Sequence, residues 1–250
     1  MALVNHAKKE INAKIVYFGP AQSGKGAVLA YIYSRIKPNL RGELKTVPVG
    51  ADNLMFFDFS PFETALPNGY RLRLHIYSLT GTVTNPATWK MTIKGADGIM
   101  IMIDPAAEHA AEAGESVAQL RDFLSAYGVG LHDTPAVLQI NSSFREILPG
   151  EAAEIAAALN LSSLSICLTD TARGEGVLEA LTTLSRQILD RVTLCEGPPP
   201  TALAATEPSL KVALLSHEVI SEGGTIRIPL TIGEGDALRR LVVTVNVAPE

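Results

Sequence analysis

The residues best suited to chemistry form the glycine-rich stretch from Gly19 to Gly26, which reads Gly-Pro-Ala-Gln-Ser-Gly-Lys-Gly. It follows the apolar run 15–18 and precedes the helix-compatible segment 27–33. A strand, a glycine loop and a helix in this order form a cradle in which backbone N–H groups and a lysine face a phosphate. The spacing fits the pattern G-x-x-x-x-G-K-[ST] except at its last position, where Gly26 replaces the hydroxyl that binds Mg²⁺. The sequence therefore predicts a nucleotide-site frame with a defect at the metal position.

The candidate nucleotide-binding residues belong to this loop, apart from one asparagine after a later apolar run: Gly19, Gln22, Ser23, Gly24, Lys25, Gly26, Ala27 and Asn141. Backbone N–H donors do not depend on side-chain identity, so the loop keeps the capacity to hold an anion. The alternative is structural, because a tight turn from strand to helix also needs glycine. Lys25 would then rest on backbone carbonyls or on an acidic neighbour. No catalytic residue and no metal ligand is predicted.

Composition narrows the classes of function. The 250 residues suit one large domain or a domain with an appendage, and the net charge of −5 argues against a nucleic-acid-binding surface. No apolar run reaches transmembrane length, and the first ten residues lack the apolar centre of a signal peptide, which predicts a cytoplasmic protein. Cys167 and Cys195 are expected to be unpaired thiols, and the five histidines lack the spacing of metal ligands.

The elements that would position the loop alternate between strands and helices. Apolar runs or alternating patterns predict strands at 15–18, 54–59, 70–77, 98–103, 136–141 and 164–169. Helical spacing predicts helices at about 26–35, 108–126, from Pro149 onward, and 176–192. The strands 54–59 and 70–77 are expected to pair as an antiparallel hairpin. The alternation predicts an α/β fold with a mixed, mostly parallel sheet flanked by helices.

The chain after about residue 195 has a different composition. Three parts are expected: a first domain at 1–195, a proline-rich linker at 196–208 and a C-terminal β meander at 209–250. The meander would contain strands at 211–219, 225–232 and 238–247. Its aliphatic face needs a cover, because a small isolated sheet buries too little apolar surface. The first domain is one candidate cover, and a second copy pairing edge to edge is the favoured one.

A set of short segments is spread over the first ~195 positions: Glu10-Ile-Asn12, Lys14-Ile-Val-Tyr17, Gly19-Pro20, Gly24-Lys25, Tyr31-Ile-Tyr33, Phe56-Phe-Asp-Phe59, Arg73-Leu-His75, Gly81 and Asp97-Gly98. In these segments the chain resembles the MglA-type small GTPases of gliding and twitching bacteria, which are relatives of the Ras-like switches. This resemblance implies a phosphate-loop small-GTPase fold, GTP or GDP as ligand, and a role in polarity or motility. The C-terminal meander lies outside the resemblance.

The resemblance fails at five functional positions. The departures are Gly26 at the Mg²⁺ hydroxyl, Asp52-Asn53-Leu54 in place of Asp-Arg-Thr, Thr82 in place of glutamine, Asn141-Ser142-Ser143-Phe144 in place of Asn-Lys-x-Asp, and Thr171-Ala172-Arg173 in place of a Ser-Ala-Lys-like segment. A water-positioning glutamine or an arginine finger contributes about 10³ to 10⁵ in rate. A guanine donor left without its acceptor costs about 1 to 3 kcal/mol. Both hydrolysis and guanine selectivity are therefore expected to be lost.

These losses together predict a pseudo-GTPase, a small-GTPase fold kept as a protein-binding scaffold or regulator. Its implied partners are a true MglA-type GTPase, a roadblock-type regulator or a cytoskeletal protein. A homo-oligomer formed through the C-terminal segment is a further expectation. The alternative is a switch that binds GTP or GDP weakly, with little or no help from Mg²⁺, and whose catalytic groups come from a partner. The two hypotheses differ in whether nucleotide changes the conformation of segment 37–53.

Overall fold

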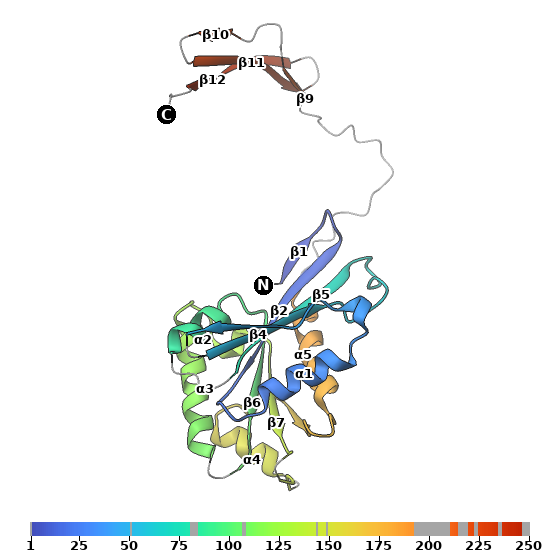
Figure 1. The fold of residues 1–250 in the computed structure, drawn as a ribbon, viewed down its shortest axis with the longest axis vertical. Helices are drawn as coiled ribbons and strands as arrows, with labels where there is room; N and C mark the ends of the chain where they lie inside the picture. Colours follow the sequence, from blue (N-terminus) through green and yellow to red (C-terminus); the bar gives the residue numbers. More distant parts are fainter. Residues whose placement is uncertain are drawn as a thin grey trace. The chain divides into compact units, whose positions relative to one another are not determined.

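The computed structural model describes residues 2–50, 52–80, 85–106, 109–143, 145–148 and 150–192, together with four strands between 211 and 246. The chain divides into two compact units, Met1–Leu194 and Cys195–Glu250, which are described separately (Figure 1). Several residues named in the sequence predictions lie outside the described residues: Gly81, Thr82, Phe144, Pro149, Cys195, the linker 196–208 and Val247.

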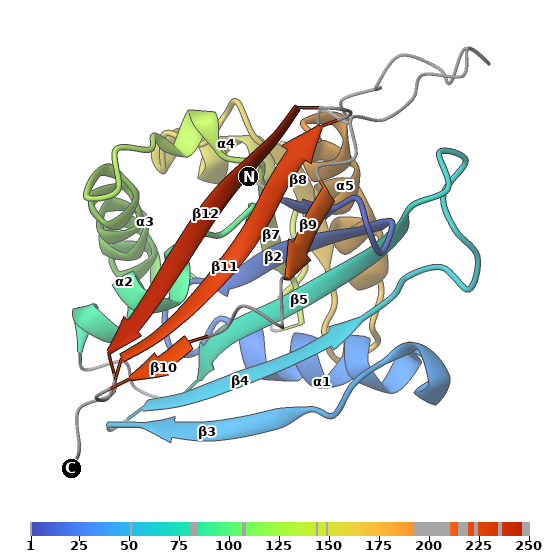
Figure 2. The ribbon, with the colours of Figure 1, turned by 90° about the horizontal axis from the view of Figure 1, so that it is seen from above.

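The first unit is built on one mixed sheet. Its strands are β1 (Leu3–Asn5), β2 (Glu10–Phe18), β3 (Lys45–Val49), β4 (Asp52–Phe59), β5 (Arg71–Thr80), β6 (Gly98–Ile103), β7 (Ala136–Asn141) and β8 (Ser165–Thr169). They lie in the order β3-β4-β5-β2-β6-β7-β8, with β1 pairing with β2. The pairs β3–β4, β4–β5 and β1–β2 are antiparallel, and the other pairs are parallel. Figure 2 shows β3, β4, β5 and β2 in succession from one edge. The predicted fold class and the antiparallel hairpin are confirmed.

Helices cover both faces of this sheet. The helices are α1 (Lys25–Arg35), α2 (Pro86–Ile93), α3 (Ala110–Ser125), α4 (Glu151–Ala158) and α5 (Val177–Asp190), with short 3₁₀ turns η1 (Pro38–Leu40) and η3 (Leu131–Asp133). Residues of α1 and α5 pack in one apolar core, and residues of α2, α3 and α4 pack in a second core on the opposite face. Figure 1 shows α2 and α3 on one side of the strands and α1 and α5 on the other.

The burial of individual residues agrees with the strands that the sequence predicted. Leu72, Leu74 and Ile76 alternate along β5 and are buried, whereas Arg71 and Arg73 between them are not. Every residue of β6 is buried, as its continuous apolar run predicted for a strand covered on both faces. The strand at 15–18 begins earlier than predicted, at Glu10, because polar residues alternate with buried ones in its first half.

Three elements of the first unit were missed in the sequence: β1, β3 and α2. Four of the five β3 residues are exposed, because β3 is an edge strand, and it also contains Pro48, so it lacks an apolar pattern. Helix α2 has only eight residues, too few to display a periodicity. Its start is nevertheless encoded, because the Asn85 side chain accepts a hydrogen bond from the Ala87 N–H at 2.9 Å and Pro86 occupies the first turn.

The second unit contains a small antiparallel sheet. Its strands are β9 (Lys211–Leu214), β10 (Ile220–Glu222), β11 (Thr225–Glu234) and β12 (Ala237–Asn246). Strand β12 pairs along the whole of β11, so β9 and β10 share the opposite flank. The predicted succession of the three longer segments is observed in β9, β11 and β12. Of the strand expected at 211–219, β9 accounts for Lys211–Leu214, and 215–219 lie outside the described residues.

The contact between Gly174 and Tyr31 gives a stability prediction. Gly174 has φ of 77°, and a Cβ there would lie 2.0 Å from the Tyr31 ring on α1. Gly69 has a similar φ of 81° but no atom within 4 Å of such a Cβ, so it provides a matched control. Gly69→Ala should lower the free energy of unfolding by ~1 kcal/mol through backbone strain alone. Gly174→Ala should lower it by a further ~1–3 kcal/mol through overpacking. Urea denaturation measures both, and equal losses would contradict the packing argument.

Candidate nucleotide-binding site

The glycine loop connects β2 to α1 and passes close to the neighbouring strand β6. A Cβ on Gly19 would lie 2.1 Å from the Met102 carbonyl oxygen, so any other residue would collide with the β6 backbone. Gly24 precedes α1 with φ of 88°, and a Cβ there would lie 2.7 Å from Asn141 Nδ2. Both glycines are therefore required by the backbone path, whether or not the loop binds a phosphate.

The Lys25 ammonium lies inside the loop on backbone carbonyls. Its side chain is 2% exposed, and Nζ donates to the carbonyl oxygens of Gly19, at 2.8 Å, and Pro20. Nζ is also 3.4 Å from Ser23 Oγ and 5.9 Å from the centroid of the Trp89 ring. Burial lowers the pKa of Lys25 to about 7. Of the two structural alternatives for this lysine, the carbonyl contact is the one that forms, and no acidic side chain is among these partners.

The position that lacks the metal hydroxyl faces the end of β5. A Cβ on Gly26 would meet only Thr80 Cγ2, at 3.4 Å, so packing does not forbid a side chain there. Thr80 Oγ1 donates to the Asn53 carbonyl at 3.3 Å, which brings the start of β4 to the same place. Asn53 and Leu54 are held opposite Pro48 and Val47 of β3. The glycine loop, the start of β4 and the end of β5 thus meet at this position.

The side chains present here do not fit an Mg²⁺ ion. Gly26 offers no ligand atom, and Leu54 cannot supply a hydroxyl. The Ser78 hydroxyl, two residues before Thr80, donates to the Tyr17 carbonyl at 3.0 Å within the sheet. Within the described ranges, no group of three His, Cys, Asp or Glu residues is arranged to hold a metal.

Asn141 ties the glycine loop to the loops after β7 and β8. Its Nδ2 donates to the Ser23 carbonyl at 3.4 Å, and its Oδ1 accepts from Ser143 Oγ at 2.7 Å and from Thr171 Oγ1 at 3.2 Å. The single Ser143 hydroxyl proton is shared between Asn141 Oδ1 and Asp170 Oδ1, which lies 3.1 Å from Ser143 Oγ, and Ser143 Oγ accepts from the Thr171 N–H at 2.8 Å. Asn141 therefore holds three loops together through hydrogen bonds.

Asp170 is the carboxylate within this network. Its Oδ1 accepts from the N–H groups of Ala172, at 2.8 Å, and Arg173, at 3.0 Å, and its Oδ2 pairs with Arg173 Nε at 3.3 Å. These hydrogen bonds, with the Arg173 N–H first, hold the pKa of Asp170 below its usual value. The carboxylate is thus committed to its own loop.

The structure brings together five of the eight predicted site residues, and they are Gly19, Ser23, Gly24, Lys25 and Asn141. The Ser23 hydroxyl donates to the Pro20 carbonyl at 2.9 Å. Gln22 and Ala27 are exposed on either side of the loop, and Gly26 faces Thr80. The part of the network formed by Ser143, Thr171 and Asp170 was not predicted as a site. Only the position of these residues directly after apolar strands could have indicated it.

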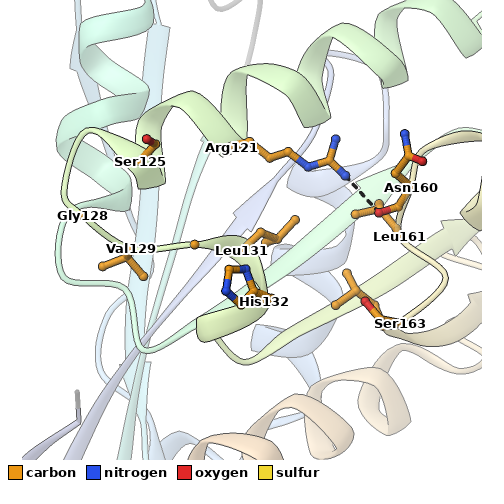
Figure 3. Close-up of a pocket in the computed structure, with 11 residues that line it drawn as sticks. Arg121, Ser125, Gly128, Val129, Leu131, His132, Asn160, Leu161 and Ser163 are labelled. Atoms are coloured by element: carbon orange, nitrogen blue, oxygen red, sulfur yellow. Dashed lines mark hydrogen bonds between the residues drawn. The ribbon is translucent and has the colours of Figure 1, made fainter.

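A separate hollow of about 510 Å³ lies far along the strands from the glycine loop. It is bordered by the end of α3, by η3 and by the turn before β8, so it lies at the amino ends of β7 and β8, whereas the glycine loop follows the carboxyl end of β2. Figure 3 shows the Arg121 guanidinium turned toward Asn160. Arg121 Nη2 donates to the carbonyls of Leu159 and Asn160, both at 3.0 Å. The hollow is not part of the nucleotide-site frame.

A glycine loop between the first long strand and α1, beside an antiparallel hairpin and four parallel strand pairs, defines a Ras-like small-GTPase fold. The chain is 32% identical over 191 residues to "Mutual gliding-motility protein MglA" of Myxococcus xanthus (strain DK1622), a match that covers 76% of this chain and 96% of that protein. No protein-family model matches the chain. The chain belongs to the MglA family of bacterial small GTPases. Among the described helices, none is long and apolar enough to cross a membrane.

Burial of Lys25 predicts a specific dependence of stability on pH. The folded protein loses the Lys25 proton near pH 7, whereas the unfolded chain keeps it up to the usual pKa of 10.5. Between these values the unfolded state binds more protons, so the free energy of unfolding should rise with pH. The rise from this group is at most about 1.4 kcal/mol per pH unit. Lys25→Met should lack this rise. In urea denaturation, the unfolding free energy of wild type should therefore increase relative to that of Lys25→Met between pH 7 and about pH 9.5.

The matched control for this titration is Lys45→Met, at an exposed lysine on β3. Its unfolding free energy should follow the wild-type curve over the same pH range. Parallel curves for wild type and Lys25→Met would show that Lys25 keeps its proton in the folded protein.

Proposed function

We propose that this chain is a catalytically silent member of the MglA family, a pseudo-GTPase that acts as a protein-binding scaffold or regulator. The observation that carries the proposal is Gly26, which has no side chain at the position whose hydroxyl holds Mg²⁺ in a working site. A Cβ there would have room beside Thr80, so packing does not account for the glycine.

The surroundings of the loop support the same proposal. Asn53 and Leu54 stand where the resemblance places an arginine and a threonine, and both are held in the β3–β4 ladder. In the loop after β8, the Asp170 carboxylate accepts hydrogen bonds from Ser143, Ala172 and Arg173. A carboxylate engaged in this way is a poor acceptor for the donors of guanine, so the proposed site has little preference for that base.

The proposed cellular context comes from the relative. Its name ties the matched protein to gliding motility, and we extend this to a role of the present chain in motility or cell polarity, within the cytoplasm. Proposed partners are a true MglA-type GTPase, a roadblock-type regulator or a cytoskeletal protein. In the proposed layout, residues 1–195 form the GTPase-like domain, 196–208 a linker and 209–250 an assembly segment that joins copies of the chain.

A second candidate function is a weak GTP or GDP switch with partner-assisted hydrolysis. It is favoured by the intact backbone of the loop and by Asn141, which still binds the Ser23 carbonyl. Hydrogen exchange of segment 37–53 separates the two functions. A switch requires different protection in GTP and GDP, whereas the scaffold requires the same protection in both.

The scaffold proposal predicts no intrinsic GTP hydrolysis. Purified full-length protein should turn over GTP more slowly than about 10⁻⁴ s⁻¹, the scale of an unassisted small GTPase. Gly26→Thr has room beside Thr80 and restores the hydroxyl, but it should remain silent because the other positions are unchanged. Single-turnover assays measure both proteins. Hydrolysis by wild type at an ordinary small-GTPase rate would refute the proposal.

The same proposal predicts that Mg²⁺ does not strengthen nucleotide binding. Neither Gly26 nor Leu54 can ligate the ion, so calorimetric titrations of GDP with Mg²⁺ and with a chelator should give dissociation constants within about a factor of two. A gain of tenfold or more with Mg²⁺ would place a functional metal site in the protein and contradict the proposal.

A further inference from the structure

One face of the C-terminal sheet is almost wholly aliphatic. The ladder places Ile228 opposite Val243, and it places Leu230 between Leu241 on β12 and Leu214 on β9. Directly opposed residues share a face of an antiparallel sheet. The aliphatic members of this face are Val212, Leu214, Ile226, Ile228, Leu230, Ile232, Leu241, Val243 and Val245, and the same face also carries Ser221, Glu234, Ala237 and Arg239. The other face carries most of the polar residues, among them Arg227, Thr231, Arg240 and Thr244.

We propose that a second copy of this chain covers the aliphatic face, so that two C-terminal sheets pack face to face across a two-fold axis as a β-sandwich. This inference rests on the proposed assembly role of the C-terminal segment and specifies its geometry. Two sheets with aliphatic inner faces pack about 10 Å apart and exclude water between them. The face is self-complementary, because its charged members, Glu234 and Arg239, lie at the hairpin end and leave the centre uncharged.

The size of the face corresponds to a small interface. Ten residues on β11, ten on β12 and seven on β9 and β10 together, at ~3.4 Å per residue and ~4.8 Å between strands, give a face of about 440 Å². Two such faces remove roughly 900 Å² from water, which is within the range of small, weak protein interfaces. Pairing of β12 edge to edge would add backbone hydrogen bonds but would leave both aliphatic faces in water. Face-to-face packing therefore removes more apolar surface from water than edge pairing does.

The surface of the first unit offers no equally broad aliphatic face among its described residues. Its exposed large apolar side chains come from separate elements, such as Leu3 on β1, Met91 on α2 and Leu168 on β8. An apolar groove between α1 and α5 is bordered by Arg35, Lys37 and Arg186. A flat sheet face does not fill a groove with charged borders, which favours the second copy as the occupant.

Adjacent residues of β12 provide a matched test, because Val243 belongs to the aliphatic face and Val242 to the opposite one. Light scattering of the full chain should give twice the chain mass of 26.6 kDa for wild type and for Val242→Glu. Val243→Glu should give the mass of one chain. A monomeric wild type would overturn the proposal in favour of a cover within the chain. A dimer that survives Val243→Glu would overturn it in favour of edge pairing.

A thiol-labelling experiment does not depend on the glutamate variants. In a background of Cys167→Ser and Cys195→Ser, Leu241→Cys should react with a maleimide at least tenfold more slowly than Val242→Cys, because only Leu241 lies on the face that the second copy covers. Equal rates would overturn the face assignment. GTP turnover is measured separately on the same proteins, so a catalytically active dimer would refute the proposed function and leave this inference standing.

Discussion

The close approach of Gly19 to the Met102 carbonyl is the constraint on which the first unit depends. Only glycine allows β2 to turn into α1 while its loop presses against β6. The same loop then presents the Ser23 carbonyl to Asn141, which links it to the loops after β7 and β8. The glycine loop is therefore the point at which four parallel strands and α1 are held in one arrangement.

This constraint is compatible with the proposed loss of catalysis in a retained fold. Gly19 and Gly24 are required by backbone sterics, and the Lys25 ammonium bonds to carbonyls of the loop, so none of the three needs a bound nucleotide to explain it. Gly26 has no such requirement, because a side chain would have room beside Thr80. Residues required by the backbone path and residues that would bind a metal or a nucleotide thus occupy neighbouring positions, but different physical constraints act on them. A family member can lose the second set and keep the first.

The sequence predicted the elements whose burial leaves a simple pattern. Strand β6 has a continuous apolar run and β7 has four apolar residues of six; both were located at their observed bounds, and the alternation in β5 identified its buried face. Edge strand β3 and the short helix α2 leave no such pattern, because most β3 residues are exposed and α2 spans two turns. The spacing of the glycine loop predicted its place in the fold. The hydrogen bonds of Ser143 with Asp170 depend on loops 27 residues apart, which no local pattern encodes.

A dimer formed by the C-terminal sheets would change what a catalytically silent fold can do. Two GTPase-like units joined through one sandwich bind a partner that has two sites with an effective concentration set by the linkers. Weak contacts at each unit then become strong together, provided that the geometry allows both to engage. Neither step requires hydrolysis or a metal, because the gain comes from tethering alone. In the proposed function, the aliphatic face of β11 and β12 would thus supply binding strength by assembly and without nucleotide.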